Sequence, residues 1–347
     1  MRHDLTIALA LAVACSGCAA VPMRMHYGIE DGAAARTWPA PPEVPRYLHA
    51  GTLTGEDNFK PVEEESGLKR FGRWLVGLDE SRANRVTLQR PQAGAVDAEG
   101  RVYVTDMSRQ AVYVFDSVGG RLDVWDRAEP YLPFVAPIGI ALGAAGQILV
   151  CDAELGRVFR LDGGGNPAGS FGAGQLQRPT GIARDPAAGL IYVSDTRAHD
   201  IKVFRDDGAF VRTLGRPGTG AGEFNAPTYL HYAAGRLYVT DTLNARVQAL
   251  DADGVPIGTI GGRGLYVGNL THPKGVAADG DGNVYVVESF YDHLLIYDTK
   301  GRYLLPISGA GADRFFLPAG VWVDDRDRVF IADMFNGRVL VLQYLGG

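Results

Sequence analysis

The sequence has few cysteines: three among 347 residues, and two of them, Cys15 and Cys18, stand near its start. Only Cys151 remains in the body of the chain, so no internal disulfide can form there. It lies in the apolar run ILVCD, where a small buried thiol is the ordinary interpretation, rather than a reactive nucleophile. A chain without disulfides must therefore rely on its hydrophobic core.

Clustered positive charge is also lacking. The 34 Lys and Arg residues are outnumbered by 40 Asp and Glu, and the formal net charge is −6. A protein that binds the phosphate backbone needs Lys and Arg gathered on one face, so nucleic acid is not an expected partner. The G-x-S-x-G motif of serine hydrolases is absent as well.

A short apolar run, from Leu5 to Ala14, follows one Arg and precedes small residues. It is too short to span a bilayer and has the length of a signal-peptide core. The SGC that follows is similar to a bacterial lipobox, whose cysteine becomes the lipidated first residue of the mature protein. We interpret residues 1–18 as a signal peptide with a lipobox, lipidated at Cys18, with Cys15 as the alternative. Neither cysteine is followed by Asp, which favours an outer-membrane lipoprotein; a periplasmic protein is the alternative.

One phrase recurs six times, as in RPQAGAVDAEGRVYVTD from Arg90 and HPKGVAADGDGNVYVVE from His272. Each copy has a proline, a β-rich run, a Gly or Asp turn and a second β-rich run that ends in an acid. The prolines recur about every 42 to 48 residues, the period of a propeller blade. They are Pro91, Pro137, Pro179, Pro227, Pro273 and Pro318. Each unit before the last holds four short runs rich in Val, Ile, Tyr and Phe, which predicts an all-β, six-bladed β-propeller over residues 88–347.

The repeated wording also resembles a known family. PTGIARDPAAGLIYVSD and GRLYVTDTLNARVQAL are similar to NHL repeats, whose pattern runs Pro-x-Gly-hydrophobic-Ala, Tyr-Val-x-Asp and Asn-x-Arg-hydrophobic. The resemblance covers residues from about 88 to 347 and implies the same six-bladed fold. It implies little about function, because this fold hosts many activities.

The last repeat lacks a fourth strand after RVLVLQYL. RYLHAGTLTG at 46–55 resembles the fourth strands of other repeats, so we expect it to pair with the last blade and close the ring. Residues 19–45, rich in Ala and Pro, are expected to be a flexible tether. The rest of the 46–87 segment is expected to hold a short helix, which either packs on the propeller or lies at a membrane surface. Its apolar face would consist of Leu68, Phe71, Trp74, Leu75 and Leu78.

Metal ligands are missing where the resemblance would place them. In the amidating lyases among NHL propellers, histidines directly after the repeat's proline hold a zinc ion. The corresponding residues here are Gln92, Ile138, Thr180, Thr228, Lys274 and Ala319. Alkyl side chains and an ammonium group cannot ligate zinc, so we expect no metal and no cofactor. A binding protein is therefore favoured over an enzyme, while a lyase or hydrolase acting at the channel mouth stays open as the alternative.

An acid ends the second β-rich run of every repeat. A residue that every blade requires is more typical of a turn cap than of a catalytic group. We therefore interpret as structural the acids Asp106, Asp152, Asp195, Asp241, Glu288 and Asp333, together with the pairs Asn244/Arg246 and Asn336/Arg338.

Departures from the repeat indicate a binding surface. The loops after the acid in the last three repeats carry Leu243, Phe290, Tyr291, Met334 and Phe335. In addition, Tyr229 replaces the repeat's glycine and Lys274 follows its proline. Aromatic anchors beside one cation are typical of a patch that binds a protein segment or a small ligand; alternatively, these side chains plug the channel mouth. The sequence thus predicts an envelope-anchored scaffold that binds an envelope protein or small ligand and meets the membrane through its lipid anchor.

Overall fold

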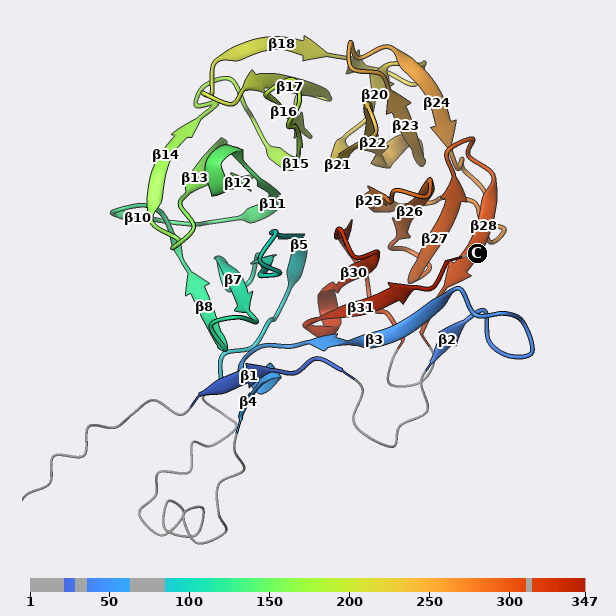
Figure 1. Cartoon of the computed structure of the whole chain (residues 1–347). Helices are drawn as coiled ribbons and strands as arrows, with labels where there is room; N and C mark the ends of the chain where they lie inside the picture. The colour runs from blue at the N-terminus through green and yellow to red at the C-terminus, as the bar shows by residue number, and fades with distance from the viewer. Residues whose placement is uncertain (1–21, 29–35, 63–84, 310–313, 347) are drawn as a thin grey trace, which may run out of the picture.

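The computed structural model describes residues 22–28, 36–62, 85–309 and 314–346. Six antiparallel sheets of four or five strands stand around a central axis, in the order of the sequence (Figure 1). This confirms the all-β, six-bladed propeller. In the described ranges no helix is long and apolar enough to cross a membrane. The predicted helix at 68–78 lies outside the described residues.

The first five blades each have four strands, numbered from the axis outward. Blade 1 consists of β5 (Pro91–Val96), β6 (Val102–Asp106), β7 (Ala111–Asp116) and β8 (Arg121–Trp125). Blade 2 consists of β11 (Pro137–Leu142), β12 (Ile148–Asp152), β13 (Arg157–Leu161) and β14 (Pro167–Phe171). Blade 3 consists of β15 (Pro179–Asp185), β16 (Leu190–Asp195), β17 (Asp200–Arg205) and β18 (Phe210–Leu214). Blade 4 consists of β21 (Pro227–Ala233), β22 (Arg236–Asp241), β23 (Arg246–Leu250) and β24 (Pro256–Ile260). Blade 5 consists of β25 (Pro273–Ala278), β26 (Asn283–Glu288), β27 (His293–Asp298) and β28 (Tyr303–Ile307).

Short elements join the blades. Two small strand pairs stand between blades 1 and 2 and between blades 3 and 4: β9 (Arg127–Glu129) with β10 (Leu132–Pro133), and β19 (Arg216–Pro217) with β20 (Glu223–Phe224). Single turns of 3₁₀ helix are η1 (Glu56–Asn58), η3 (Ala144–Gly146), η4 (Thr242–Asn244) and η6 (Met334–Asn336).

Blade 6 is completed by the N-terminal part of the chain. Its inner strands are β29 (Val321–Val323), β30 (Arg328–Asp333) and β31 (Arg338–Tyr344), and its outer strands are β3 (Tyr47–Leu53) and β2 (Thr37–Trp38). β3 pairs antiparallel with β31, from Tyr47 opposite Tyr344 to Leu53 opposite Val339. The predicted closure of the ring is thereby confirmed, because strands from residues 37–53 and 321–344 meet in one sheet.

The structure differs from the sequence prediction over residues 19–45. This range holds β1 (Met23–Met25), which pairs with β4 (Phe59–Pro61), and also β2. β1 lies against blade 1, because a Cβ on Gly120 would meet the Met23 carbonyl oxygen. Strands of two and three residues are too short to show alternation in a sequence rich in Ala and Pro.

The middle strands of each blade are buried on both faces because neighbouring blades pack face to face. All six residues of β7 are buried, whereas the outermost β8 has no buried residue. This explains the near-continuous apolar runs such as VYVTD and AVYVFD. Cys151 belongs to this core: it is fully buried, and burial raises the pKa of its thiol. The interpretation of Cys151 as a small buried side chain is confirmed.

The repeat's glycine is required where the innermost strands meet. A Cβ on Gly181 would lie 2.2 Å from the Thr228 carbonyl oxygen, and one on Gly320 would lie 2.2 Å from the Gln92 oxygen. Neighbouring blades thus touch backbone to backbone near the axis. No room is left for a side chain that points from the glycine toward the next blade.

The acid that ends each second strand caps two backbone segments. One Asp106 oxygen accepts hydrogen bonds from the backbone N–H groups of Gln89 and Arg90, at 2.6 and 2.9 Å. The other accepts from Ser108 and Arg109, both at 3.0 Å. Asp152 repeats the arrangement in blade 2. The acids are structural, as the sequence predicted.

We predict that Leu53→Ala lowers the free energy of unfolding by about 2–5 kcal/mol, because Leu53 is fully buried between β31 and Phe59. Urea denaturation measures this change. Leu304→Ala on the outer strand β28 is the matched control, because Leu304 is 43% exposed and its loss should cost less than about 0.5 kcal/mol. Equal losses for the two variants would contradict a closing role for β3.

Candidate functional site

The ring has two distinct faces. The upper face carries the turns that follow the strand-terminal acids and the connections between blades, since both segments bind the same carboxylate, as around Asp106. The lower face carries the turns between first and second strands, such as the one where the Asp97 N–H bonds to the Arg101 carbonyl.

The upper face bears a large exposed apolar surface over blades 4 to 6. Four of the predicted residues belong to it: Leu243, Phe290, Tyr291 and Phe335, which are 39–63% exposed. Four others, 54–85% exposed, join them: Leu265, Tyr266, Val267 and Phe316. We call these eight residues the apolar patch. The sequence reasoning missed the last four because they lie in connections between blades, although GLYVGN places three apolar residues between glycines.

The residues of the apolar patch meet in pairs, and the loop after β26 also bonds to the connection that enters blade 6, where the Leu317 N–H donates to Asp292 at 2.8 Å. The rings of Phe290 and Tyr291 meet edge to face at 4.9 Å, and those of Phe316 and Phe335 lie 5.2 Å apart. A small cavity of about 90 Å³ separates Tyr291 from the connection Leu265–Asn269. Segments from three parts of the sequence, residues 265–269, 290–292 and 316–335, therefore lie close together on this face.

Arginines lie at the edge of the apolar patch. Arg90 stacks over the Phe335 ring at 5.1 Å, and Arg263 donates a hydrogen bond to the Leu243 carbonyl at 3.0 Å. Neither makes an ion pair with a carboxylate in the described part of the chain, whereas Arg314 pairs with Asp292.

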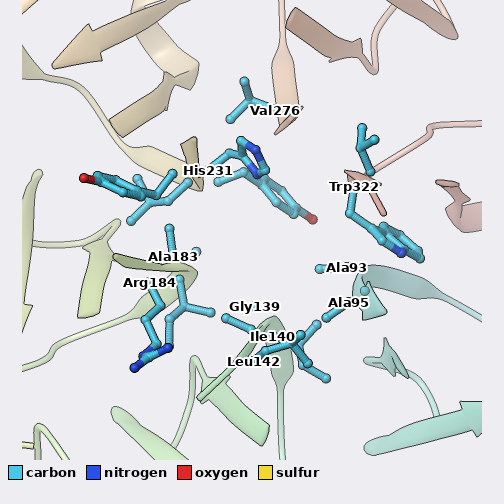
Figure 2. Close-up of a pocket in the computed structure, with 18 of the residues that line it drawn as sticks. Ala93, Ala95, Gly139, Ile140, Leu142, Ala183, Arg184, His231, Val276 and Trp322 are labelled. Atoms are coloured by element: carbon cyan, nitrogen blue, oxygen red, sulfur yellow. The ribbon is translucent and has the colours of Figure 1, made fainter. Parts of the chain in front are cut away.

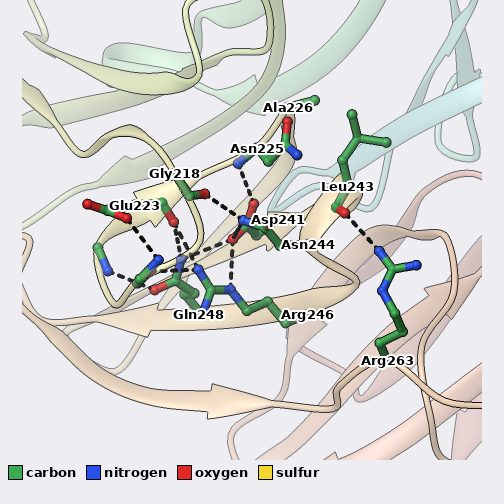
Figure 3. A network of polar contacts seen from close by, with 12 residues as sticks. Gly218, Glu223, Asn225, Ala226, Asp241, Leu243, Asn244, Arg246, Gln248 and Arg263 are labelled. Atoms are coloured by element: carbon green, nitrogen blue, oxygen red, sulfur yellow. Dashed lines mark hydrogen bonds and ion pairs between the residues drawn. The ribbon is translucent and has the colours of Figure 1, made fainter.

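The loop that presents Leu243 is held by a buried polar network (Figure 3). Asp241 accepts hydrogen bonds from the backbone of Asn225 and from the side chains of Asn244 and Arg246, at 2.7, 2.9 and 2.8 Å. Arg246 also donates to the carbonyls of Gly220 and Glu223, which fixes the connection from blade 3. The Asn/Arg pair thus has the structural role that the sequence predicted.

Three predicted residues do not belong to the apolar patch: Met334, Tyr229 and Lys274. Met334 is only 8% exposed, since it begins the tight 3₁₀ turn η6 and points inward. Tyr229 is 9% exposed, and its hydroxyl donates to the Gln92 carbonyl at 3.1 Å. Because blades 4 and 1 are opposite in a six-membered ring, Tyr229 crosses the axis and plugs the channel. For this residue the alternative reading, a channel plug, is the correct one.

Lys274 lies at the start of β25, the innermost strand of blade 5, and is half-buried. Its ammonium group has no hydrogen-bond or ion-pair partner among the residues described, and burial lowers its pKa. It is one of the six residues that follow the repeat's prolines, of which four are buried: Gln92, Ile138, Thr180 and Ala319.

A cavity of about 530 Å³ occupies the axis below Tyr229. Its wall comes from the innermost strands of all six blades and is mostly glycine, alanine and aliphatic side chains. Figure 2 shows His231 beside Val276, with Ala93 and Ile140 across the space and Arg184 and Trp322 at its sides. The sequence reasoning did not select His231, because a single histidine in a strand gives no motif.

His231 is held as a neutral side chain. Its Nε2 lies 3.1 Å from the Ala278 carbonyl, so Nε2 carries the proton and donates it. Burial, only partly opposed by this hydrogen bond, lowers the pKa of His231 to about 4.

No group of three or more His, Cys, Asp or Glu side chains in the described ranges is placed to hold a metal ion.

Comparison with known proteins agrees with the repeat. The NHL repeat model matches one stretch of the chain. Residues 176–204 are an NHL repeat. No curated protein matches the sequence.

Several solved propellers share the fold at low sequence identity. Virginiamycin B lyase from Staphylococcus aureus is 15% identical over 74% of this chain and 96% of its own, with a TM-score of 0.55. A gluconolactonase from Xanthomonas campestris is 16% identical over 75% and 89%, with a TM-score of 0.56. A chain of a nidogen/laminin complex is 21% identical over 73% and 90%, with a TM-score of 0.55. These likenesses extend to the fold alone.

We predict that stability falls as the pH drops from about 6.5 to 4, in part through His231. The unfolded histidine binds a proton below its ordinary pKa of 6.5, whereas the folded one stays neutral down to about 4. Its contribution is therefore complete above pH 6.5 and is lost through this window, at up to about 1.4 kcal/mol per pH unit. Urea denaturation of His231→Leu across the window should show a shallower pH dependence than the original protein; an identical slope would contradict the burial of a neutral ring.

Proposed function

We propose that this protein is an exported, lipid-anchored binding scaffold whose upper face binds a segment of another envelope protein. The observation that carries the proposal is the apolar patch, since soluble proteins rarely expose so many neighbouring large apolar side chains without a partner. Aromatic residues at 39–63% exposure, such as Phe290 and Phe335, are the type that dominates binding energy in interfaces.

The chemistry of the apolar patch supports a peptide segment of a particular kind. The cavity of about 90 Å³ beside Tyr291 has room for one apolar side chain. Arg90 and Arg263 at the edge have no carboxylate partner in the described ranges, so they would attract acidic residues. The segment would therefore carry an apolar anchor flanked by Asp or Glu.

The predicted lipid anchor supports an outward orientation of the apolar patch. Cys18 precedes β1 by five residues, which span at most about 18 Å when extended. β1 lies against Gly120, in the turn between β7 and β8 on the lower side of blade 1. A membrane reached by so short a connection would lie nearer the lower face, and the upper face would point away from it.

A second candidate function is an enzyme acting at the upper channel mouth, and Lys274 favours it. A half-buried ammonium group without a counter-ion, with its pKa lowered by burial, can act as a base or nucleophile. Virginiamycin B lyase and gluconolactonase are enzymes that share the fold. Loss of a chemical turnover on Lys274→Met, with partner recovery by the apolar patch unchanged, would favour this candidate over the scaffold.

We predict that Phe290→Ala combined with Phe335→Ala weakens recovery of the partner and barely changes thermal unfolding. Each exposed ring should contribute about 1 kcal/mol or more to binding, so affinity should fall roughly thirtyfold. Crosslinking and pull-down from native envelopes measure recovery, and Val118→Ala combined with Tyr131→Ala is the control, since both residues are exposed outside the apolar patch. A large fall in melting temperature with binding intact would show that the rings are structural.

We predict that Cys18→Ser releases the protein into the periplasm and removes acyl labelling, because the thiol that carries the lipid is lost. Fractionation and metabolic labelling with a fatty acid measure both effects. Cys15→Ser is the matched variant and should stay anchored. Release by Cys15→Ser alone would show that Cys15 is the lipidated residue. If neither change releases the protein, the lipid anchor is refuted.

A further inference from the structure

The axial cavity has the size and shape of a small-molecule site. Its volume of about 530 Å³ falls within the range of ligand pockets. Tyr229 closes its upper end, since the hydroxyl reaches the Gln92 carbonyl across the ring. The cavity is also lined by Leu142, Gly143 and Pro186, at or next to the turns of the lower face, so a ligand would enter from that side.

Arg184 and Tyr232, which line the cavity, already have acidic partners. Arg184 makes two hydrogen bonds to Asp206, at 2.7 and 2.6 Å. Tyr232 donates to Asp185 at 2.6 Å. An ionic ligand would therefore meet no unpaired counter-ion in the described wall and would have to leave water without compensation.

Among the described wall residues, His231 offers an unpaired side-chain acceptor, whereas the buried Nε1–H of Trp322 is an unpaired donor. Because Nε2 donates to the Ala278 carbonyl, the lone pair of the ring is on Nδ1. Nδ1 has no hydrogen-bond partner among the described residues, and the ring lines the cavity (Figure 2). It can accept one hydrogen bond from a ligand O–H or N–H group.

We propose that the axial cavity binds a neutral, largely apolar small molecule that donates a hydrogen bond from a hydroxyl group to Nδ1 of His231. The aliphatic wall supplies the contact area and His231 fixes the orientation. This site lies on the other side of Tyr229 from the apolar patch, so it is independent of the partner proposed for the upper face.

The test uses two probes of similar size, 2-naphthol and 2-methoxynaphthalene, of which only the first has a hydroxyl group. Isothermal titration calorimetry on the full mature protein should show the naphthol binding about tenfold more tightly, the effect of one hydrogen bond. His231→Leu should remove this preference by weakening naphthol binding alone, and His231→Gln, which keeps an acceptor, should restore part of it.

Two variants locate the site. Ala95→Phe fills the cavity, and Leu142→Trp narrows its lower mouth, so each should abolish binding of both probes; circular dichroism checks that each variant folds. The Phe290→Ala, Phe335→Ala protein is the control and should bind both probes normally, which keeps failure here distinct from failure of the upper-face proposal. The inference is overturned if neither probe binds at millimolar concentration, if both bind equally, or if binding survives in both folded cavity variants.

Discussion

The buried carboxylate at the end of each second strand is the interaction on which the rest of the structure depends. These six acids are at most 1% exposed, yet each is satisfied by backbone N–H groups from the connection that enters the blade and, in most blades, also from the turn that follows the acid. Without these donors a buried carboxylate would be strongly unfavourable, so the two segments and the acid fix one another. Blade 5 keeps the arrangement with a longer side chain: Glu288 accepts from Thr271, His272 and Phe290.

Because the main chain of the upper face is fixed by these caps, its side chains are free to vary. Phe290 donates its own backbone N–H to Glu288 while its ring is 63% exposed, so the position is held whatever side chain it carries. Near the axis, too, the backbone is fixed while the side chain can differ between blades. Glycine is required where innermost strands touch, as at Gly181, but blade 4 carries Tyr229 in that place and directs the ring across the channel. The repeated residues hold the ring together, and the departures from the repeat shape its surfaces.

The features that the repeat determines, the six blades and the closure of the ring, could be predicted from the sequence. The six prolines and acids gave the blades, and the likeness of 46–55 to other outer strands gave the closure that β3 and β31 make. Features without a repeat were harder to predict. Leu265–Val267 lie in a connection between blades, which the repeated phrase does not include, and the burial of Met334 depends on a tight turn rather than on composition. The axial cavity gave no signal at all, because its wall consists of the same Gly, Ala and Val that any propeller core requires.

Tyr229 stands between the axial cavity below and the apolar patch above. On the lower face, burial and then the neighbouring Asp279, Asp281 and Asp324 raise the pKa of Asp327. Inside the cavity, the paired charges of the wall offer an ion no compensation, which favours the neutral ligand proposed there. The upper face has aromatic rings beside Arg90 and Arg263. A ligand below and a partner above could influence each other only through a shared element, and the hydrogen bond from Tyr229 to Gln92 is the contact that spans the axis between them.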